Sequence, residues 1–282
     1  MKIIQADKIR RLERIAWELR KDVVRMFAHS GTGHFGGSLS CAEIVACLYF
    51  DVLQIDPKNP KWDGRDRFII SKGHSCPTVY AALAGLGFFP DAWLDEFEDT
   101  GAPLTMHPDM HKIPGIEAST GALGHGLSIG LGMAQAAKMD RREHRVYVLL
   151  GDAELQEGSV WEAIMAAPSF QLTNLIAIVD RNTQGVDGPT EELIPLEPLQ
   201  DRWRAFGWEP REIDAHSISA ILDGLAWAKE AKGSPRVLIC RGTKGKGVSF
   251  IENNPAWHSA RPTEEEIKLA FGEIEEALKR LQ

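Results

Sequence analysis

Two short apolar runs of the sequence each lead directly into polar side chains that could bind a cation. Residues 146–150 are followed by Gly151 and Asp152, and residues 175–179 are followed by an Asp-Arg-Asn segment that ends at Asn182. If both runs are neighbouring strands of a parallel sheet, their carboxyl ends meet at one edge, where such sheets bind ligands. A carboxylate and an amide oxygen, with a backbone carbonyl nearby, are hard oxygen ligands that suit Mg²⁺ or Ca²⁺ and leave positions open for phosphate.

The same spacing has a simpler explanation, in which neither residue binds a ligand. Asp152 could cap the helix that follows it, and Asn182 could lie in a turn. Spacing alone does not separate the two interpretations. Two glycine-rich segments could have bound phosphate directly, but residues 242–249 lack the Gly-Lys-Ser/Thr ending of a P-loop and residues 121–130 lack the GxGxxG spacing. A metal ion that itself binds phosphate therefore remains as the way in which this chain could hold a phosphate-bearing ligand.

Strands and helices alternate along the sequence and would position these residues. Strands are expected at 67–71, 146–150, 175–179 and 237–240, and helices at 9–26, 41–50, 79–86, 133–138, 159–167 and 263–281. The alternation predicts an α/β fold with a mostly parallel sheet covered by helices on both faces. The glycine- and serine-rich segment 31–38 is expected to be a loop. Because no linker or repeat divides the chain, residues 1–282 are expected to form one domain.

The composition is that of an acidic, globular chain. Its 282 residues are 44% apolar, which is enough for a full-sized core, and the formal net charge is -8. This charge argues against nucleic acid or an anionic membrane as a partner, since both need a basic face. The sequence shows no signal peptide and no membrane-spanning stretch, and its four cysteines show no metal-ligand spacing. A cytoplasmic protein is expected.

Several motifs together resemble those of the transketolase family. The segment 151–182 is similar to the thiamine-diphosphate motif, which opens with Gly-Asp-Gly and closes with Asn about thirty residues later. Motifs in the transketolase order cover nearly the whole chain, at residues 33–36, 66–74, 106–108, 119–126, 151–158 and 252–258. The resemblance covers only the diphosphate-binding domain. The pyrimidine-binding and C-terminal domains are missing, so the chain resembles the N-terminal subunit of a split transketolase.

The resemblance implies a role for individual residues. The metal ligands would be the side chains of Asp152 and Asn182 and the backbone carbonyl of Gln184. Thiamine diphosphate would lie against a set of side chains and backbone groups at His74, Gly121, Leu123, Asp152, Ala153, Asn182 and His258. The groups facing the sugar, as proton shuttles and hydroxyl partners, would be His34, His107 and His258. Glu157 would link the two active sites across a dimer.

The reaction implied by this resemblance is transfer of a two-carbon ketol unit from a ketose phosphate to an aldose phosphate. It would use thiamine diphosphate and Mg²⁺, for which Ca²⁺ or another divalent ion could substitute. The family's catalytic glutamate lies in the pyrimidine domain and has no candidate here. The chain is therefore expected to need a C-terminal partner subunit, in a heterotetramer with two copies of each. Pentose phosphates are the sugars expected first. Branched or sulfonated sugars would use the same part of the active site on this chain.

Some residues depart from the family pattern or carry no expected role. Ala153 replaces a glycine, Phe35 replaces a proline, and His125 stands where many relatives have Gln. Ordinary surface positions are expected for His29, His111, His144 and His216.

Three other functions compete with this one. The α subunit of a 2-oxo acid dehydrogenase E1 shares the metal motif but not the transketolase histidine loops. A non-catalytic thiamine-diphosphate-binding homologue would need only the metal site, not four separate histidine loops. A dinucleotide dehydrogenase is disfavoured by the missing GxGxxG.

Overall fold

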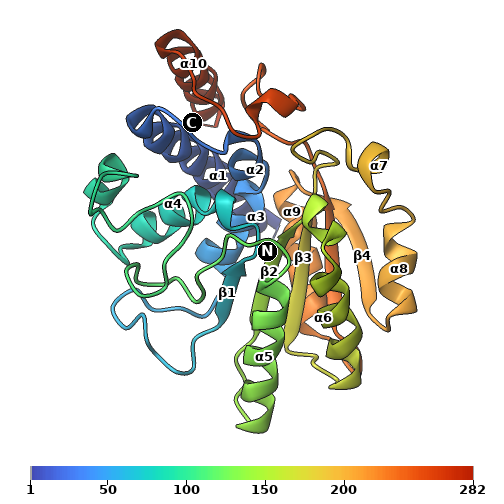
Figure 1. Cartoon of the computed structure of the whole chain (residues 1–282). Coiled ribbons are helices and arrows are strands. Elements are labelled where there is room, and N and C mark those ends of the chain that lie inside the picture. The colour runs from blue at the N-terminus through green and yellow to red at the C-terminus, as the bar shows by residue number, and fades with distance from the viewer. Residues whose placement is uncertain (1, 282) are drawn as a thin grey trace.

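A parallel five-stranded sheet forms the centre of the computed structural model, which describes residues 2–281 (Figure 1). The strand order is β1-β2-β3-β5-β4, and every pair is parallel. The strands are β1 (Arg67–Ile70), β2 (Val146–Gly151), β3 (Leu175–Arg181), β4 (Glu209–Asp214) and β5 (Arg236–Arg241). The predicted parallel α/β sheet is confirmed.

Pairing of β2 with β3 sets the two candidate ligand segments side by side. In this register Gly151 lies opposite Asp180, so the residues that follow each strand leave the sheet at the same edge. The crossover between the strands runs through α6 (Gly158–Ser169) and satisfies the requirement for a long connection between parallel neighbours. The edge strand β4 was not predicted, because its residues are only partly buried and it contains a proline.

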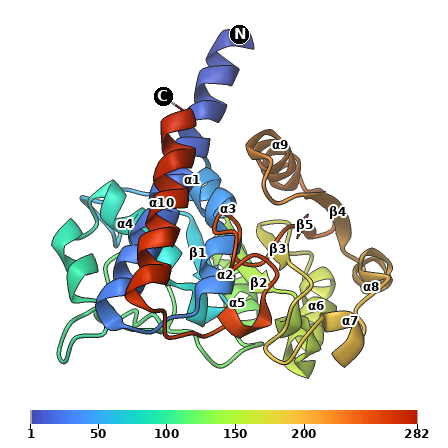
Figure 2. The ribbon, with the colours of Figure 1, turned by 90° about the horizontal axis from the view of Figure 1, so that it is seen from above.

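Helices cover both faces of the sheet, as expected. On the front face in Figure 1 lie α5 (Gly126–Met139) and α6, and the core on this face also takes side chains from α8 (Leu199–Ala205). The opposite face carries α1 (Lys2–Ser30), α3 (Ala42–Cys47), α4 (Pro77–Leu86) and α9 (Ile218–Lys229). Figure 2 shows α10 (Glu264–Arg280) running alongside α1. Two short α-helices, α2 (Phe35–Ser40) and α7 (Thr190–Leu193), complete the α-helices of the described residues.

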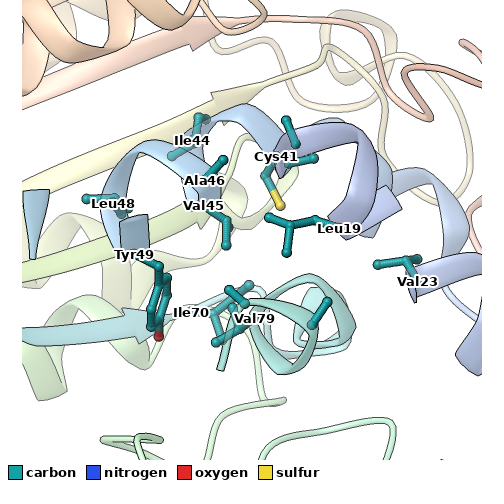
Figure 3. Packing of buried hydrophobic residues seen from close by; sticks show 14 of the residues in the cluster. Leu19, Val23, Cys41, Ile44, Val45, Ala46, Leu48, Tyr49, Ile70 and Val79 are labelled. Atoms are coloured by element: carbon teal, nitrogen blue, oxygen red, sulfur yellow. The ribbon is translucent and has the colours of Figure 1, made fainter. Parts of the chain in front are cut away.

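Alternate side chains of the central strands feed the two cores. Tyr147 and Leu149 of β2 belong to the cluster under α1 and α3, whereas Val146, Val148 and Leu150 belong to the cluster under α5 and α6. Figure 3 shows the first cluster, where Val45 of α3 packs near Val79 of α4. Burial on both faces explains why these strands are continuous apolar runs.

The prediction of a loop over residues 31–38 is wrong from Phe35 onward, because α2 begins there. All six residues of α2 are buried, and its glycines allow close approach: a Cβ on Gly37 would lie 2.5 Å from the hydroxyl oxygen of Ser75. The small residues therefore serve tight packing here. The predicted helix 41–50 is also divided, into α3 and a π-helical turn at Leu48–Val52.

Two further structural observations bear on the protein's environment. The four cysteines are buried and unpaired. Across residues 2–281, we find no helix with the length and apolar character needed to cross a membrane.

Candidate functional site

A pocket at the carboxyl edge of the sheet gathers residues from loops that are far apart in the sequence. Its walls come from the segments after β1, β2, β3 and β5, from the turns before α2 and α5, and from the loop before α10. The lining residues are His34, Gly37, Lys72, His74, His107, Gly121, Leu123, Gly151, Asp152, Ala153, Glu154, Asn182, Gln184, Gly185, Val186, Lys244 and His258. Every site residue predicted from the sequence except Glu157 is in this set.

His34 and His258 meet because their loops are joined directly. Gly33 and Ala260 form an antiparallel bridge with two backbone hydrogen bonds of 3.0 Å. Beside this bridge the buried ring of Phe35 packs edge-on against Trp257, with 5.2 Å between ring centroids. Phe35, a departure from the family pattern, thus anchors the segment that carries His34.

Four histidine rings form one cluster, in which three rings surround that of His34. The centroid distances from His34 are 5.2 Å to His74, 5.6 Å to His258 and 6.3 Å to His107. Burial lowers the pKa of His34 and, more strongly, that of His74. Burial and the nearby Lys244 lower the pKa of His258 to about 4. His34, His74 and His258 are therefore neutral near pH 7 and can both accept and donate hydrogen bonds.

Close backbone contacts hold the glycine-rich loop against the histidines. A Cβ on Gly73 would lie 2.6 Å from the carbonyl of Thr120, and one on Gly121 would lie 2.8 Å from the His107 ring. Gly121 also has a φ of +157°, which side chains rarely adopt. These glycines permit the loop that presents Gly121 and Leu123 to the pocket.

The sequence left open whether Asp152 caps a helix or belongs to a ligand site, and in the structure its carboxylate has both positions. One of its carboxylate oxygens accepts a hydrogen bond of 2.8 Å from the amide of Ala153, at the start of the 3-10 helix Ala153–Gln156. The other oxygen accepts from the guanidinium of Arg181 at 3.0 Å and from the amide of Thr183. Asp152 therefore caps a helix and also lines the pocket. Because Ala153 adopts 3-10 helical geometry, its Cβ requires no unusual backbone.

Asn182 is oriented by a buried neighbour. Its Nδ2 donates to Asp180 Oδ2 at 3.0 Å, and its Oδ1 accepts from the amide of Gln184 at 3.2 Å. Asp180 is also paired with Lys72, whose Nζ lies 2.6 Å from the same carboxylate oxygen. This arrangement fixes which end of the Asn182 carboxamide is the oxygen.

The oxygen atoms at this edge fit a divalent cation. Asp152, Asn182 and Gln184 line one pocket, and the buried Oδ1 of the neighbouring Asp180 has no hydrogen-bond donor. Burial, and then the charge of Asp180, raise the pKa of Asp152, as expected where two carboxylates share a poorly solvated place. Residues 2–281 contain no group of three His, Cys, Asp or Glu suited to a metal. A site here would depend on amide and carbonyl oxygens, which hard cations accept.

Lys244 is a pocket residue that the sequence did not single out. Its buried Nζ donates to the carbonyls of Gln184 (3.0 Å) and Gly185 (2.8 Å) and lies 2.9 Å from His258 Nδ1. Burial lowers the pKa of Lys244 to about 8, so the amine is still mostly protonated at pH 7. In the sequence, the glycines on either side of Lys244 were the only feature that could have drawn attention to it. Glycines at such a place indicate that the backbone closely approaches another group.

Glu157 and His216 are the two residues whose positions differ from those of the other predicted residues. Glu157 is exposed just before α6 and does not line the pocket, and its role at a partner's site stays a prediction. The expectation that His216 is an ordinary surface residue is wrong. Its ring is only 17% exposed and is hydrogen-bonded on both nitrogens.

Comparison with known proteins gives a consistent set of relatives. Residues 13–274 match the family model "Transketolase, thiamine diphosphate binding domain". The chain is 45% identical over 257 residues to the 6-deoxy-6-sulfo-D-fructose transketolase subunit SqwG of Clostridium sp. (strain MSTE9), covering 91% of this chain and 94% of the relative. It is 43% identical over 263 residues to an apulose-4-phosphate transketolase subunit of Phocaeicola vulgatus, covering 93% of each.

Solved structures show the same fold in longer chains. The transketolase of Campylobacter jejuni superposes with a TM-score of 0.88 at 30% identity, over 96% of this chain. This chain spans only 45% of the length of that solved chain.

Proposed function

The chain belongs to the transketolase family, where it corresponds to the thiamine-diphosphate-binding N-terminal subunit of a split enzyme, and on this basis we propose its reaction. With a partner chain it transfers a two-carbon ketol unit from a ketose phosphate to an aldose phosphate. The observation that carries the proposal is the convergence of ten predicted residues from separate loops on one pocket at the carboxyl edge of the sheet.

Within this pocket the proposed roles follow from position and chemistry. Asp152, Asn182 and the Gln184 carbonyl would hold Mg²⁺ or another divalent ion, and Lys244 would meet the diphosphate beside His74 and His258. Since an imidazole ring can accept and donate protons, His34, His107 and His258 would bind sugar hydroxyls and move protons at the reacting oxygen atoms.

Thiamine diphosphate, when bound, supplies the carbanion chemistry of the reaction. The backbone of Gly121 and Leu123, held by the close packing around Gly73, would support its aminopyrimidine. Asp152 and Asn182 are buried at the strand ends, which would limit the access of competing water to the diphosphate end of the pocket.

A partner subunit is part of the proposal. Relatives of nearly the same length are named as subunits of sugar transketolases, whereas single-chain transketolases are more than twice as long. We propose that the partner brings the pyrimidine-binding and C-terminal domains, in a heterotetramer with two copies of each chain. Glu157 would lie at the contact between the two active sites. The four unpaired cysteines agree with the cytoplasm as the compartment.

The choice of sugar is open to direct assay, because relatives are named for 6-deoxy-6-sulfo-D-fructose and for apulose 4-phosphate. The test combines this chain with its partner, thiamine diphosphate, Mg²⁺ and an aldose phosphate acceptor. Xylulose 5-phosphate, apulose 4-phosphate and 6-deoxy-6-sulfo-D-fructose are compared as donors. Ketol transfer with one donor, seen only in the mixture of both chains, is the expected result.

The Asp152→Ala variant tests the metal site. It should abolish the metal-dependent part of thiamine-diphosphate binding, because it removes the carboxylate from the predicted ligand set. Titration calorimetry with and without Mg²⁺ measures this, and an unchanged metal-dependent affinity would contradict the assignment. If the native chain and its partner bind thiamine diphosphate but transfer no ketol unit from any of the sugars, the non-catalytic homologue becomes the better explanation.

A further inference from the structure

The loop that follows β5 carries Lys244 into the pocket and is fixed along its length. Residues 242–247 read Gly-Thr-Lys-Gly-Lys-Gly, a composition that would leave a free loop highly flexible. In the structure Gly242 donates to the carbonyl of Arg181, and Gly245 donates to the carbonyl of Gly36. Contacts with residues outside the loop therefore set the position of Lys244. Two further contacts of this kind come from side chains that are charged or titratable and mostly buried.

His216 and Arg20 bind the loop on either side of Lys244. His216 Nε2 accepts a hydrogen bond of 2.8 Å from the amide of Thr243, the residue before the lysine. The Nε of Arg20, in α1, donates at 2.8 Å to the carbonyl of Lys246, two residues after it. These contacts bracket Lys244 and join the loop to two distant parts of the chain.

One carboxylate, that of Glu43, contacts both Arg20 and His216. Glu43 Oε2, in α3, lies 2.6 Å from Arg20 Nη2 and 3.3 Å from His216 Nδ1. Arg20 is fully buried and Glu43 is 8% exposed. Burial alone would raise the pKa of Glu43, but Arg20 and His216 outweigh it and hold that pKa at about 2. Glu43 is therefore ionised at neutral pH.

The partners of His216 also determine its tautomer. Because an amide can only donate, Nε2 must carry the lone pair and Nδ1 the proton, which then points at the Glu43 carboxylate. Because the donor and acceptor nitrogens of the ring are fixed, the contact of His216 with Glu43 also orients its contact with the amide of Thr243. Nothing in the proposed reaction uses these groups directly.

We propose that Arg20, Glu43 and His216, here called the Glu43 cluster, are positioning residues that hold Lys244 in reach of the cofactor diphosphate. The proposal rests on the proposed function, since it takes the ligand of Lys244 to be thiamine diphosphate. A buried ion pair at this place could instead serve only the packing of α1 against α3. The two explanations differ in whether the effect of the cluster passes through Lys244.

A double-mutant cycle on the full chain separates them. His216→Leu removes both ring contacts, Lys244→Ala removes the amine, and the third variant carries both changes. Thiamine-diphosphate affinity is measured with Mg²⁺ and the partner subunit by titration calorimetry. Lys244→Ala should weaken binding about tenfold or more, the usual effect of losing a charge-assisted hydrogen bond. His216→Leu should weaken it about threefold to tenfold in the native background and by less than about twofold beside Lys244→Ala.

Two variants control this measurement. His216→Gln keeps an acceptor near the place of Nε2 and should restore most of the affinity that His216→Leu loses. His29→Leu makes the same substitution at a histidine 38% exposed on α1, and should leave the affinity unchanged. Equal losses from His216→Leu in both backgrounds, or no loss in either, would overturn the proposal.

Amide hydrogen exchange tests the positioning without any ligand. In His216→Leu, peptides covering residues 242–247 should exchange faster, while those of β5 should keep their native rate. An unchanged rate for the loop would overturn the proposal even if cofactor binding fell. If the native chain binds no thiamine diphosphate even with its partner subunit, the proposed function fails, and the exchange result still decides whether the Glu43 cluster holds the loop.

Discussion

Removing Lys72 should destabilise the fold strongly, because it leaves a charge without its partner beneath the pocket. Lys72 Nζ lies 2.6 Å from Asp180 Oδ2 and 2.8 Å from the carbonyl of Gly37. The two side chains are 3% and 0% exposed. Despite burial, the lysine holds the pKa of Asp180 below its usual value, and the carboxylate holds that of Lys72 above its own. The pair is therefore ionised at neutral pH.

The expected magnitude follows from this burial. Removing one member of a buried ion pair costs about 3–5 kcal/mol, against a total stability of about 5–15 kcal/mol for a typical domain. In Lys72→Met only Ser40 (2.6 Å) and Asn182 (3.0 Å) still donate to Asp180 Oδ2. At about 2–4 °C per kcal/mol for a chain near this size, the melting temperature should fall by roughly 6–20 °C.

Thermal and urea unfolding followed by circular dichroism measure this loss. The double variant Lys72→Met with Asp180→Leu should recover most of it, because apolar residues of similar volume can replace a buried pair. Arg14→Ala is the control: it removes a pair whose members, Arg14 and Glu18, are 56% and 47% exposed, and should cost less than about 1 kcal/mol. A loss below about 1 kcal/mol in Lys72→Met, or a double variant less stable than the single one, would refute this reasoning.

Three further changes probe separate parts of the structure. His107→Ala should reduce turnover far more than thiamine-diphosphate affinity, and equal loss in steady-state kinetics and calorimetry would make His107 structural. Gly73→Ala should weaken cofactor binding, because its Cβ would lie 2.6 Å from the Thr120 carbonyl; native affinity would contradict the contact. Glu43, with a folded pKa of about 2, stabilises the fold above its unfolded pKa and loses this contribution as pH falls from about 4 to 2. Urea unfolding between pH 5 and 2 should show a shallower loss of stability in Glu43→Gln than in the native chain.

The sequence predicted the strand ends well because burial on both faces leaves a simple pattern. Residues 146–150 and 175–179 are apolar at every position, so their extent and parallel pairing could be inferred. The expected meeting of Asp152 and Asn182 then followed from the geometry of parallel neighbours. The roles of the histidine loops came from the family resemblance, since periodicity does not predict which loops meet.

Other features depend on contacts between distant segments and left little local signal. The edge strand β4 has no fully buried residue and contains Pro210, so no apolar run identifies it. A glycine-rich segment can be a loop or, as in α2, a helix packed too closely for larger side chains. Arg20 lies on a helix with many other charged residues, and only the folded chain shows that its partners are Glu43 and Lys246.

The charges around the pocket explain how an acidic chain can hold a diphosphate. The positive charge of Lys72 is balanced by Asp180, and burial leaves His34 and His258 neutral near pH 7. Among the described residues that line the pocket, Lys244 has no carboxylate within ion-pair distance, so its charge is free to meet an anion. One lysine cannot neutralise a diphosphate, which carries more than one negative charge. The divalent cation proposed at Asp152 would supply the remaining positive charge, so the lysine and the metal site are two parts of one solution for binding the cofactor.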